Sequence, residues 1–396
     1  MSIAPVESPA HESSVSTSHA HDRIRLESIA IQDFRNLERV NLHFPAEGVA
    51  LIGDNGHGKT NLLEAIYYLQ ILRSIRDARD QDLTRFDAFG FHIAAKVHSP
   101  AAHAIGVGFE RASKKKKVTL DGLVPRRLTD ALGKLPSVMF SPRDLELVSG
   151  APTERRRYLD LVLALTDRKY LSALQHYRAN LARRNAALRN ATKRGANDSE
   201  VSVWEPALAE HGSVLIESRA KWVNDSSGEY ARVSEEIGEK GRAQMRYICP
   251  FAESEARRDV LLAALEEKRS LDMRRGITSV GPHRDDLELT LGGRDLRLFG
   301  SAGQQRTAAI ALRMLEAATL RDHAGAEPLL LLDDPFAELD IRRAARILVM
   351  LEKRGLGQTI LAVPREADIP PGLMQLDRLS VRDGVVSEMK VRLKAF

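Results

Sequence analysis

The residues with the clearest chemical meaning form one glycine-rich stretch in the first part of the chain. It fits the phosphate-binding pattern G-x-x-x-x-G-K-[ST] at every fixed position. Its members are Gly53, Asp54, Asn55, Gly56, His57, Gly58, Lys59 and Thr60. Glycines let consecutive backbone N–H groups curl around an anion, and a helix N-terminus adds partial positive charge. In such a loop Lys59 reaches the β- and γ-phosphates of a nucleoside triphosphate, and Thr60 places its hydroxyl on Mg²⁺.

The elements around this stretch are those that a phosphate loop requires. Residues 49–52 are a short apolar run, which predicts a buried strand. Leu62, Leu63, Ile66 and Leu69 follow at helical spacing. A chance glycine-rich turn is the alternative, and it is disfavoured because strand, loop and helix agree.

Paired aspartates near the other end of the chain supply the next part of such a site. Residues 329–332 are four leucines, which predict a buried strand that ends at Asp333 and Asp334. An acidic residue in this place holds Mg²⁺, so Asp333 is assigned to the metal with Thr60. Asp334 would orient the attacking water or accept its proton, which makes Lys59 and Asp334 the predicted catalytic residues. A strand that ends in solvated aspartates is the alternative.

The long separation between loop and aspartates predicts a discontinuous α/β domain. A single α/β nucleotide domain places these strands much closer in sequence, and residues 144–275 have a helical pattern. Leucines with coiled-coil-like spacing lie in this block: Leu171, Leu174, Leu181 and Leu188. We expect two long helices that form an antiparallel hairpin. The predicted organisation is a head formed by residues 23–143 and 276–396, an inserted helical arm at 144–275, and a disordered tail at 1–22.

A third motif, Ser301-Ala302-Gly303-Gln304-Gln305, leads into an apolar helix. Ser301 and Gln304 have capping-box spacing, which by itself is a weak signal. Its place before the metal aspartate resembles the signature motif of ABC-type ATPases, in which the signature of one subunit binds the γ-phosphate held by another. The resemblance assigns Ser301, Gly303 and Gln304 to the nucleotide of a second copy. Residues 337–340 resemble the dimer-contact loop of that family.

The closer resemblance is to the RecF family, the recombination-mediator branch of the SMC/Rad50-like ATPases. It extends from about residue 24 to near the C-terminus. It rests on motifs in this order: Phe34-Arg35-Asn36-Leu37, the phosphate loop, Phe140-Ser141-Pro142-Arg143-Asp144-Leu145, Arg155-Arg156-Arg157-Tyr158-Leu159-Asp160, Arg184-Asn185, Gly281-Pro282-His283-Arg284-Asp285-Asp286, residues 301–307 and residues 329–340.

This resemblance implies an ABC-type P-loop ATPase head with a short helical lobe. It implies ATP and Mg²⁺ as cofactors, ATP-dependent homodimerisation on duplex DNA and on gapped or single-strand junctions, and slow, DNA-dependent hydrolysis that acts as a switch. It also implies work with RecO and RecR to load recombinase at gaps, in DNA repair, replication and the SOS response. The chain departs from the family at Arg143, usually acidic, at Pro335, and at residues 361–364, which lack a hydroxyl. These departures concern the hydrolysis rate more than nucleotide binding.

Composition agrees with a DNA-binding protein of the cytoplasm, associated with the nucleoid. The chain has 396 residues, a net charge of +5 and a pI near 9.2. Cys249 is the only cysteine, so no disulfide forms within one chain. No apolar run is long enough for a transmembrane helix, so no membrane partner is expected. The first 22 residues do not read as a secretory signal.

Several basic and polar groups have two open interpretations. Lys114 to Lys117 is a solvated turn or a DNA contact. The arm cluster is a set of phosphate contacts or a solvated face: Arg178, Arg183, Arg184, Arg189, Lys193 and Arg194. Arg35 and Asn36 form a surface turn or contact the nucleotide. His283 and Arg284 are assigned to the join between arm and head, with the γ-phosphate surroundings as the alternative.

Three other functions share parts of this pattern. A transporter ATPase would have the signature but needs a shorter insert and a surface that couples to a membrane protein. A structural SMC- or Rad50-like protein needs hundreds of residues of heptads, which residues 144–275 do not supply. A monomeric P-loop kinase or GTPase would not carry the signature before the metal strand.

Overall fold

The computed structural model describes residues 24–99, 103–194, 198–336, 340–353 and 357–389. The predicted tail at 1–22 and residues 337–339 of the dimer-contact loop lie outside the described residues. Within the described part of the chain, no helix is both long and apolar enough to cross a membrane.

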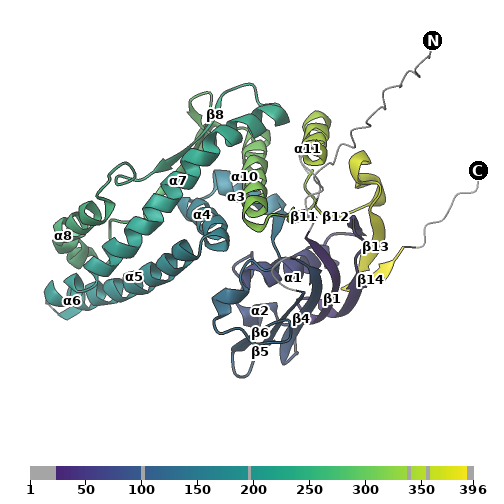
Figure 1. Ribbon diagram of the computed structural model, residues 1–396, viewed down its shortest axis with the longest axis horizontal. Coiled ribbons are helices and arrows are strands. Elements are labelled where there is room, and N and C mark those ends of the chain that lie inside the picture. Colours follow the sequence, from purple (N-terminus) through teal and green to yellow (C-terminus); the bar gives the residue numbers. More distant parts are fainter. Residues whose placement is uncertain (1–23, 100–102, 195–197, 337–339, 354–356, 390–396) are drawn as a thin grey trace, which may run out of the picture.

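The centre of the molecule is a six-stranded sheet (Figure 1). Its strands follow the order β14 (Val385–Glu388), β13 (Asp377–Arg382), β3 (Gly48–Ile52), β12 (Thr359–Val363), β11 (Leu329–Asp333) and β7 (Ser137–Phe140). All neighbours are parallel except β13 and β14. Every residue of β3, β11 and β12 is buried, as expected for parallel strands covered on both faces. The sheet joins strands from both ends of the chain, as the sequence predicts.

A second sheet is antiparallel and has five strands. Its order is β2 (Leu37–His43), β1 (Arg25–Phe34), β4 (Gly90–His98), β5 (Ala104–Glu110) and β6 (Lys115–Leu120). Helix α1 (Lys59–Ile71) contacts strands of both sheets, and its side chains are buried nearly all round. The helix that carries the phosphate loop is therefore held between two sheets. The short helix α2 (Asp80–Leu83) follows it.

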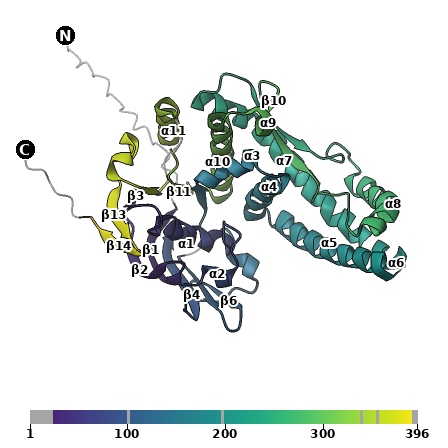
Figure 2. The same cartoon turned by 180° about the vertical axis from the view of Figure 1, so that it is seen from behind.

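The remaining helices form a lobe beside the sheets, except for the last two, which pack on a face of the six-stranded sheet (Figure 1). They are α3 (Glu146–Ser149), α4 (Pro152–Thr166), α5 (Arg168–Arg194), α6 (Asp198–Ser202), α7 (Glu205–Ile237), α8 (Arg257–Arg275), α9 (Leu296–Phe299), α10 (Ala302–Ala324) and α11 (Ile341–Lys353). Figures 1 and 2 show α5 and α7 side by side, with α6 and α8 at their far end. The predicted helical hairpin is confirmed, and a short helix, α6, lies between its two long helices.

One strand in the helical block is absent from the sequence prediction. β8 (Ala243–Ile248) pairs with β9 (Asp286–Leu291), which pairs with β10 (Arg294–Asp295). Ala243 and Met245 are buried while their neighbours are exposed, so the strand has the two-residue period of a sheet edge. The pairing of β8 with β9 crosses the predicted boundary at residues 275 and 276, and the division into head and arm stays a prediction.

Candidate nucleotide site

The phosphate loop leaves β3 and enters α1 in the predicted order. Gly56 and Gly58 have φ angles of 86° and 111°, in the left-handed region that favours glycine. A Cβ on Gly58 would lie 2.8 Å from the side chain of Asn36. Glycine is therefore required at position 58, both for the left-handed backbone and for the close approach of Asn36.

Two distant turns hold the loop in place. The backbone N–H of Gly384 donates to the carbonyl of His57, and the N–H of Asp383 donates to His57 Nδ1, both at 2.9 Å. On the other side, Asn61 Nδ2 donates to Asn36 Oδ1 at 2.8 Å. Asn36 thus belongs to the loop surroundings, while Arg35 forms an ion pair with the buried Glu64. The turn at Asp383 is a part of the site that the sequence did not predict.

Lys59 lies inside the loop. Its side chain is buried, and its ammonium donates to the carbonyl oxygens of Gly53 and Asp54. Burial lowers the pKa of Lys59, and the nearby Asp333, Asp334 and Asp54 oppose that shift. The ammonium is positioned where bound phosphates would replace the carbonyls as its partners.

Thr60 and Asp333 meet although they come from opposite ends of the chain. Thr60 Oγ1 donates to Asp333 Oδ1 at 3.0 Å. Burial raises the pKa of Asp333, and the hydrogen bond from Thr60 is the largest opposing effect. One hydroxyl and one carboxylate oxygen side by side are hard ligands, which suit Mg²⁺. The residues present therefore fit the predicted metal.

Asp334 lies just past β11 with a left-handed φ of 45°. Its N–H donates to the carbonyl of Ala362 in β12, at 2.9 Å, which fixes its backbone at the end of the sheet. Burial raises its pKa, and Asp368 adds to the shift. A carboxylate with a raised pKa is a better proton acceptor, as the predicted catalytic role requires.

A cavity of about 490 Å³ adjoins the contact between Thr60 and Asp333. Thr60 and Asp333 form part of its wall together with Arg76, Ser141 and Arg143. Arg76 follows α1, and its Nη1 donates to Asn61 Oδ1 at 3.4 Å. Neither Arg76 nor Ser141 was predicted as a site residue, because each follows an element whose neighbours only the sheet order reveals.

The segment after β7 connects this cavity to α10. Arg313 of α10 donates to Asp144, and Arg306 donates to the carbonyl of Pro142. Arg313 is also paired with Glu316 in the same helix. The helix that follows the signature motif is therefore tied to the wall of the cavity beside Thr60 and Asp333.

The signature residues have the predicted cap but do not touch the phosphate loop. Ser301 Oγ accepts from the N–H of Gln304 at 3.3 Å, and Gln304 Oε1 accepts from the N–H of Ser301 at 2.9 Å. Ser301 is exposed, and Gly303 and Gln304 are partly exposed. Figure 2 places α9, which directly precedes Ser301, beside β10 and away from α1. Within one chain the N-terminus of this helix is capped by Ser301, and the side chain of Arg343 in α11 lies against Gly303.

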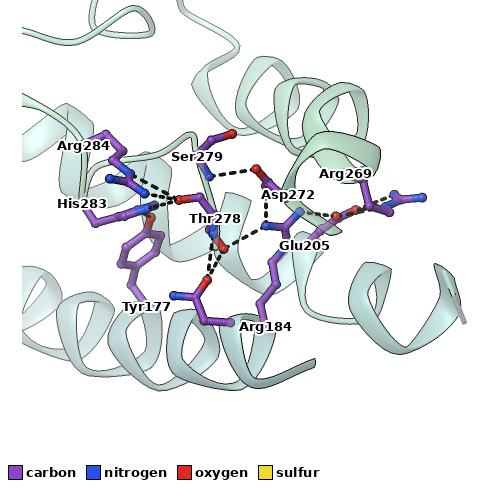
Figure 3. Close-up of polar contacts among 10 residues, drawn as sticks. Tyr177, Arg184, Glu205, Arg269, Asp272, Thr278, Ser279, His283 and Arg284 are labelled. Carbon is purple, nitrogen blue, oxygen red and sulfur yellow. Dashed lines mark hydrogen bonds and ion pairs between the residues drawn. The ribbon is translucent and has the colours of Figure 1, made fainter. Parts of the chain in front are cut away.

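The arm arginines have different surroundings. Arg184 is fully buried and donates to Asp272, Thr278 and Glu205 (Figure 3). Arg184 therefore fits neither open interpretation of the arm cluster, phosphate contact or solvated face, and instead ties α5 to α7 and α8. Arg183 and Arg189 are exposed, and the side chains of Lys193 and Arg194 lie outside the described part of the chain.

His283 and Arg284 have the structural role predicted for them. His283 Nδ1 is bonded to Tyr177 Oη, and Arg284 donates to the carbonyl of Thr278 (Figure 3). Burial lowers the pKa of His283 to about 4, so the ring is neutral at pH 7. His283 fastens the segment after α8 to α5, whereas Arg284 bonds to Thr278 within that same segment.

The lysine run at 114–117 lies at the tip of the hairpin formed by β5 and β6. Lys114, Lys115 and Lys117 are exposed, whereas Lys116 forms an ion pair with Asp80 at 2.8 Å. Three of the four charges therefore remain available at the surface.

Replacing Arg184 by Met is expected to lower the free energy of unfolding by about 3–5 kcal/mol, because it leaves Asp272 buried beside no cation. Urea unfolding followed by circular dichroism measures the loss. The matched control is Arg232→Met, since Arg232 is exposed and pairs with Glu229 and Glu236 on one helix face; its expected effect is below about 1 kcal/mol. Equal losses in the two variants would contradict the assignment.

Comparisons with known proteins agree with this geometry. The family model described as the RecF/RecN/SMC N-terminal domain matches residues 25–368. The protein named DNA replication and repair protein RecF from Chloroflexus aurantiacus is 37% identical, covering 90% of this chain and 97% of its own length. The protein of that name from Herpetosiphon aurantiacus is 35% identical, with coverages of 90% and 98%.

A solved structure, described as the recombination mediator protein RecF-ATP in the RecFOR pathway, has the same fold. It superposes with a TM-score of 0.85 at 30% identity, covering 94% of this chain and 100% of the other. The match includes the helical lobe as well as the sheets. This chain belongs to the RecF family, within the RecF/RecN/SMC group of ABC-type ATPases.

Proposed function

We propose that this protein is an ATP-dependent, DNA-binding recombination mediator. It dimerises on ATP, clamps DNA, hydrolyses ATP slowly, and helps to load recombinase at gaps during repair and replication. The observation that carries the proposal is the contact between Thr60 and Asp333, together with an exposed Ser301 on a different part of the same chain. The names of the relatives and the RecF-ATP structure support ATP binding and a role in DNA repair and replication.

The loop residues 53–60 would hold the phosphates, with Lys59 paired to the β- and γ-phosphates. Thr60 and Asp333 would hold Mg²⁺, Asp333 through the water shell. The metal, when bound, neutralises negative charge that develops on the transferred phosphoryl group. Asp334 would position the attacking water and take its proton.

The arrangement of the two motifs supports homodimerisation. The N-terminus of α10 has a positive dipole and the exposed hydroxyl of Ser301, and the guanidinium of Arg343 lies beside Gly303; together they suit an anion. In one chain this terminus lies away from the phosphate loop, so a second copy has to supply it. Ser301, Gly303 and Gln304 would then contact the γ-phosphate held by the partner copy.

DNA binding would use surface charge without base-specific contacts. Lys114, Lys115 and Lys117 and the exposed arm arginines Arg183 and Arg189 are candidates. Such contacts would bind duplex DNA and gapped junctions whatever their base sequence, and the affinity would fall as the salt concentration rises. The pathway named for the solved relative supports RecO and RecR as partners. A mediator that binds DNA would work in the cytoplasm, with the nucleoid.

Two rival functions make different demands. A structural SMC-like clamp without a mediator role would dimerise in the same way but would not respond to RecO and RecR. A transporter-type ATPase would bind a membrane partner through its insert, whereas here the insert folds onto α10 and β9. The SMC-like clamp is the harder of the two to distinguish from a mediator, because it has the same ATPase head.

Light scattering of the purified protein tests the central claim. We expect the mass of one chain without nucleotide and twice that mass with ATP and Mg²⁺, with duplex DNA increasing the dimer fraction. ADP with Mg²⁺ is the matched control, since it lacks the γ-phosphate that the signature is proposed to contact. A mass that stays monomeric under all of these conditions rules the clamp out.

A further inference from the structure

A second cavity, of about 370 Å³, lies where the end of the phosphate-loop helix meets the helical lobe. Its lining comes from the segment after α1, from α4, α5 and α7, and from the segment after α8. It shares Asp77, Glu154 and Arg157 with the cavity beside Thr60 and Asp333, but neither of those two residues lines it. The two cavities are therefore neighbours with a common wall.

Arginines dominate the wall of this second cavity. Arg73, Arg156, Arg157, Arg178 and Arg219 line it, against the carboxylates of Asp77, Glu154 and Asp160. Asp160 is shared between Arg178 and Arg219, and Asp77 pairs with Arg157. The neutral ring of His283 adds no charge. The lining thus carries an excess of positive charge, and two of its carboxylates already have partners.

Arg73 is the least compensated of these arginines. It directly follows α1, and its side chain is partly buried. Within the described part of the chain it forms no hydrogen bond and no ion pair, although Asp160 lies close enough to influence it. A guanidinium removed from water without an acceptor is unfavourable. Its position therefore suits an acceptor that is supplied from outside the chain.

Three of these arginines, Arg73, Arg157 and Arg178, line the same cavity and influence one another's charge. Burial lowers the pKa of Arg73, and Arg178 lowers it further. Burial, Arg73 and Arg178 together lower the pKa of Arg157 to about 10. Asp77 pairs with Arg157 and Asp160 with Arg178, so Arg73 is the one of the three whose repulsion by the other two is not offset by an ion pair of its own among the described residues. Arg178 is about half exposed, so the group opens to solvent on that side.

We propose that Arg73, Arg157 and Arg178 form a binding site for a phosphate group. Guanidinium forks match the oxygen spacing of phosphate and bind it through charge-assisted hydrogen bonds. A phosphate held there would join the end of the phosphate-loop helix to α4 and α5 of the helical lobe. This site adjoins the cavity beside Thr60 and Asp333, with Arg157 in the wall between them, and its first test requires no ATP.

Calorimetric titration with inorganic phosphate tests the site, against chloride at matched ionic strength. The titration uses Lys59→Met protein, so that the phosphate loop does not contribute. We expect saturable binding of one phosphate per chain, weakened at least about tenfold by adding Arg73→Gln, which removes charge-assisted hydrogen bonds. Because Arg73 has no carboxylate partner, this change orphans no acid. Arg232→Gln, at an exposed arginine outside the cavity, is the control and should leave binding unchanged.

Two results would overturn the site: no saturable binding to Lys59→Met protein, or equal affinity with and without Arg73→Gln. A short single-stranded oligonucleotide then distinguishes the source of the phosphate. If inorganic phosphate displaces the oligonucleotide, and Arg73→Gln weakens both ligands, the natural occupant is a backbone phosphate. If phosphate binds without displacing it, the occupant is free phosphate. Either result requires Arg73.

Discussion

Replacing Lys59 by Met is expected to weaken ATP binding by at least about 100-fold and to abolish ATP-dependent dimerisation. The ammonium is buried within the loop and lies against the carbonyls of Gly53 and Asp54. Met has a similar length but offers neither charge nor donor, so the bound phosphates lose charge-assisted hydrogen bonds that together contribute about 3 kcal/mol or more. Titration with a fluorescent ATP analogue measures the affinity, and light scattering measures the mass.

The fold should survive this change. A buried ammonium is costly to desolvate, as the lowered pKa of Lys59 indicates, so an apolar replacement removes that cost. We therefore expect an unfolding temperature no lower than that of the native protein. Lys115→Met, at an exposed lysine, is the matched control and should bind ATP normally. ATP binding by Lys59→Met at the native affinity would show that the loop is not the nucleotide site.

Features that the sequence predicts well are those written in a local pattern. Buried parallel strands give continuous apolar runs, so β3 and β11 are recognisable from their residues alone. The chemistry of the metal then pairs Thr60 with Asp333, and the hydrogen bond between them agrees with that prediction. No sequence pattern reveals that β12 lies between β3 and β11 in the sheet.

Contacts between distant segments carry no such pattern. His57 is held by the turn at Asp383, and Gly58 is packed against Asn36, yet nothing in either segment points to the other. Arg184 lies in a strongly polar helix, where arginine usually indicates solvent. Its burial depends on Glu205 and Asp272, which come from two other helices. β8 is different, since the alternation of Ala243, Met245 and Tyr247 was a usable signal.

The phosphate loop is proposed to bind ATP and the signature motif to bind the partner copy, so a change in the signature should affect dimerisation alone. Replacing Ser301 by Arg is expected to leave ATP binding within about twofold of the native affinity and to abolish ATP-dependent dimerisation. Ser301 lies outside the phosphate loop of its own chain, so nucleotide binding does not depend on it. In the proposed dimer a long side chain at this position would occupy the space that the partner's γ-phosphate needs. Light scattering with ATP and Mg²⁺ measures the outcome.

Arginine at this position also removes the N-cap of α10, which contributes about 1 kcal/mol, so a second variant separates the two effects. Ser301→Asp keeps a capping oxygen for the N–H of Gln304 but places a negative charge against the phosphate. We expect it to block dimerisation while the unfolding temperature stays native. Ser301→Asn, which caps equally well without charge, should dimerise more than Ser301→Asp. Both Ser301→Arg and Ser301→Asp could instead form dimers at the same ATP concentrations as the native protein. The N-terminus of α10 would then not contact the partner's nucleotide, and dimerisation would use another surface.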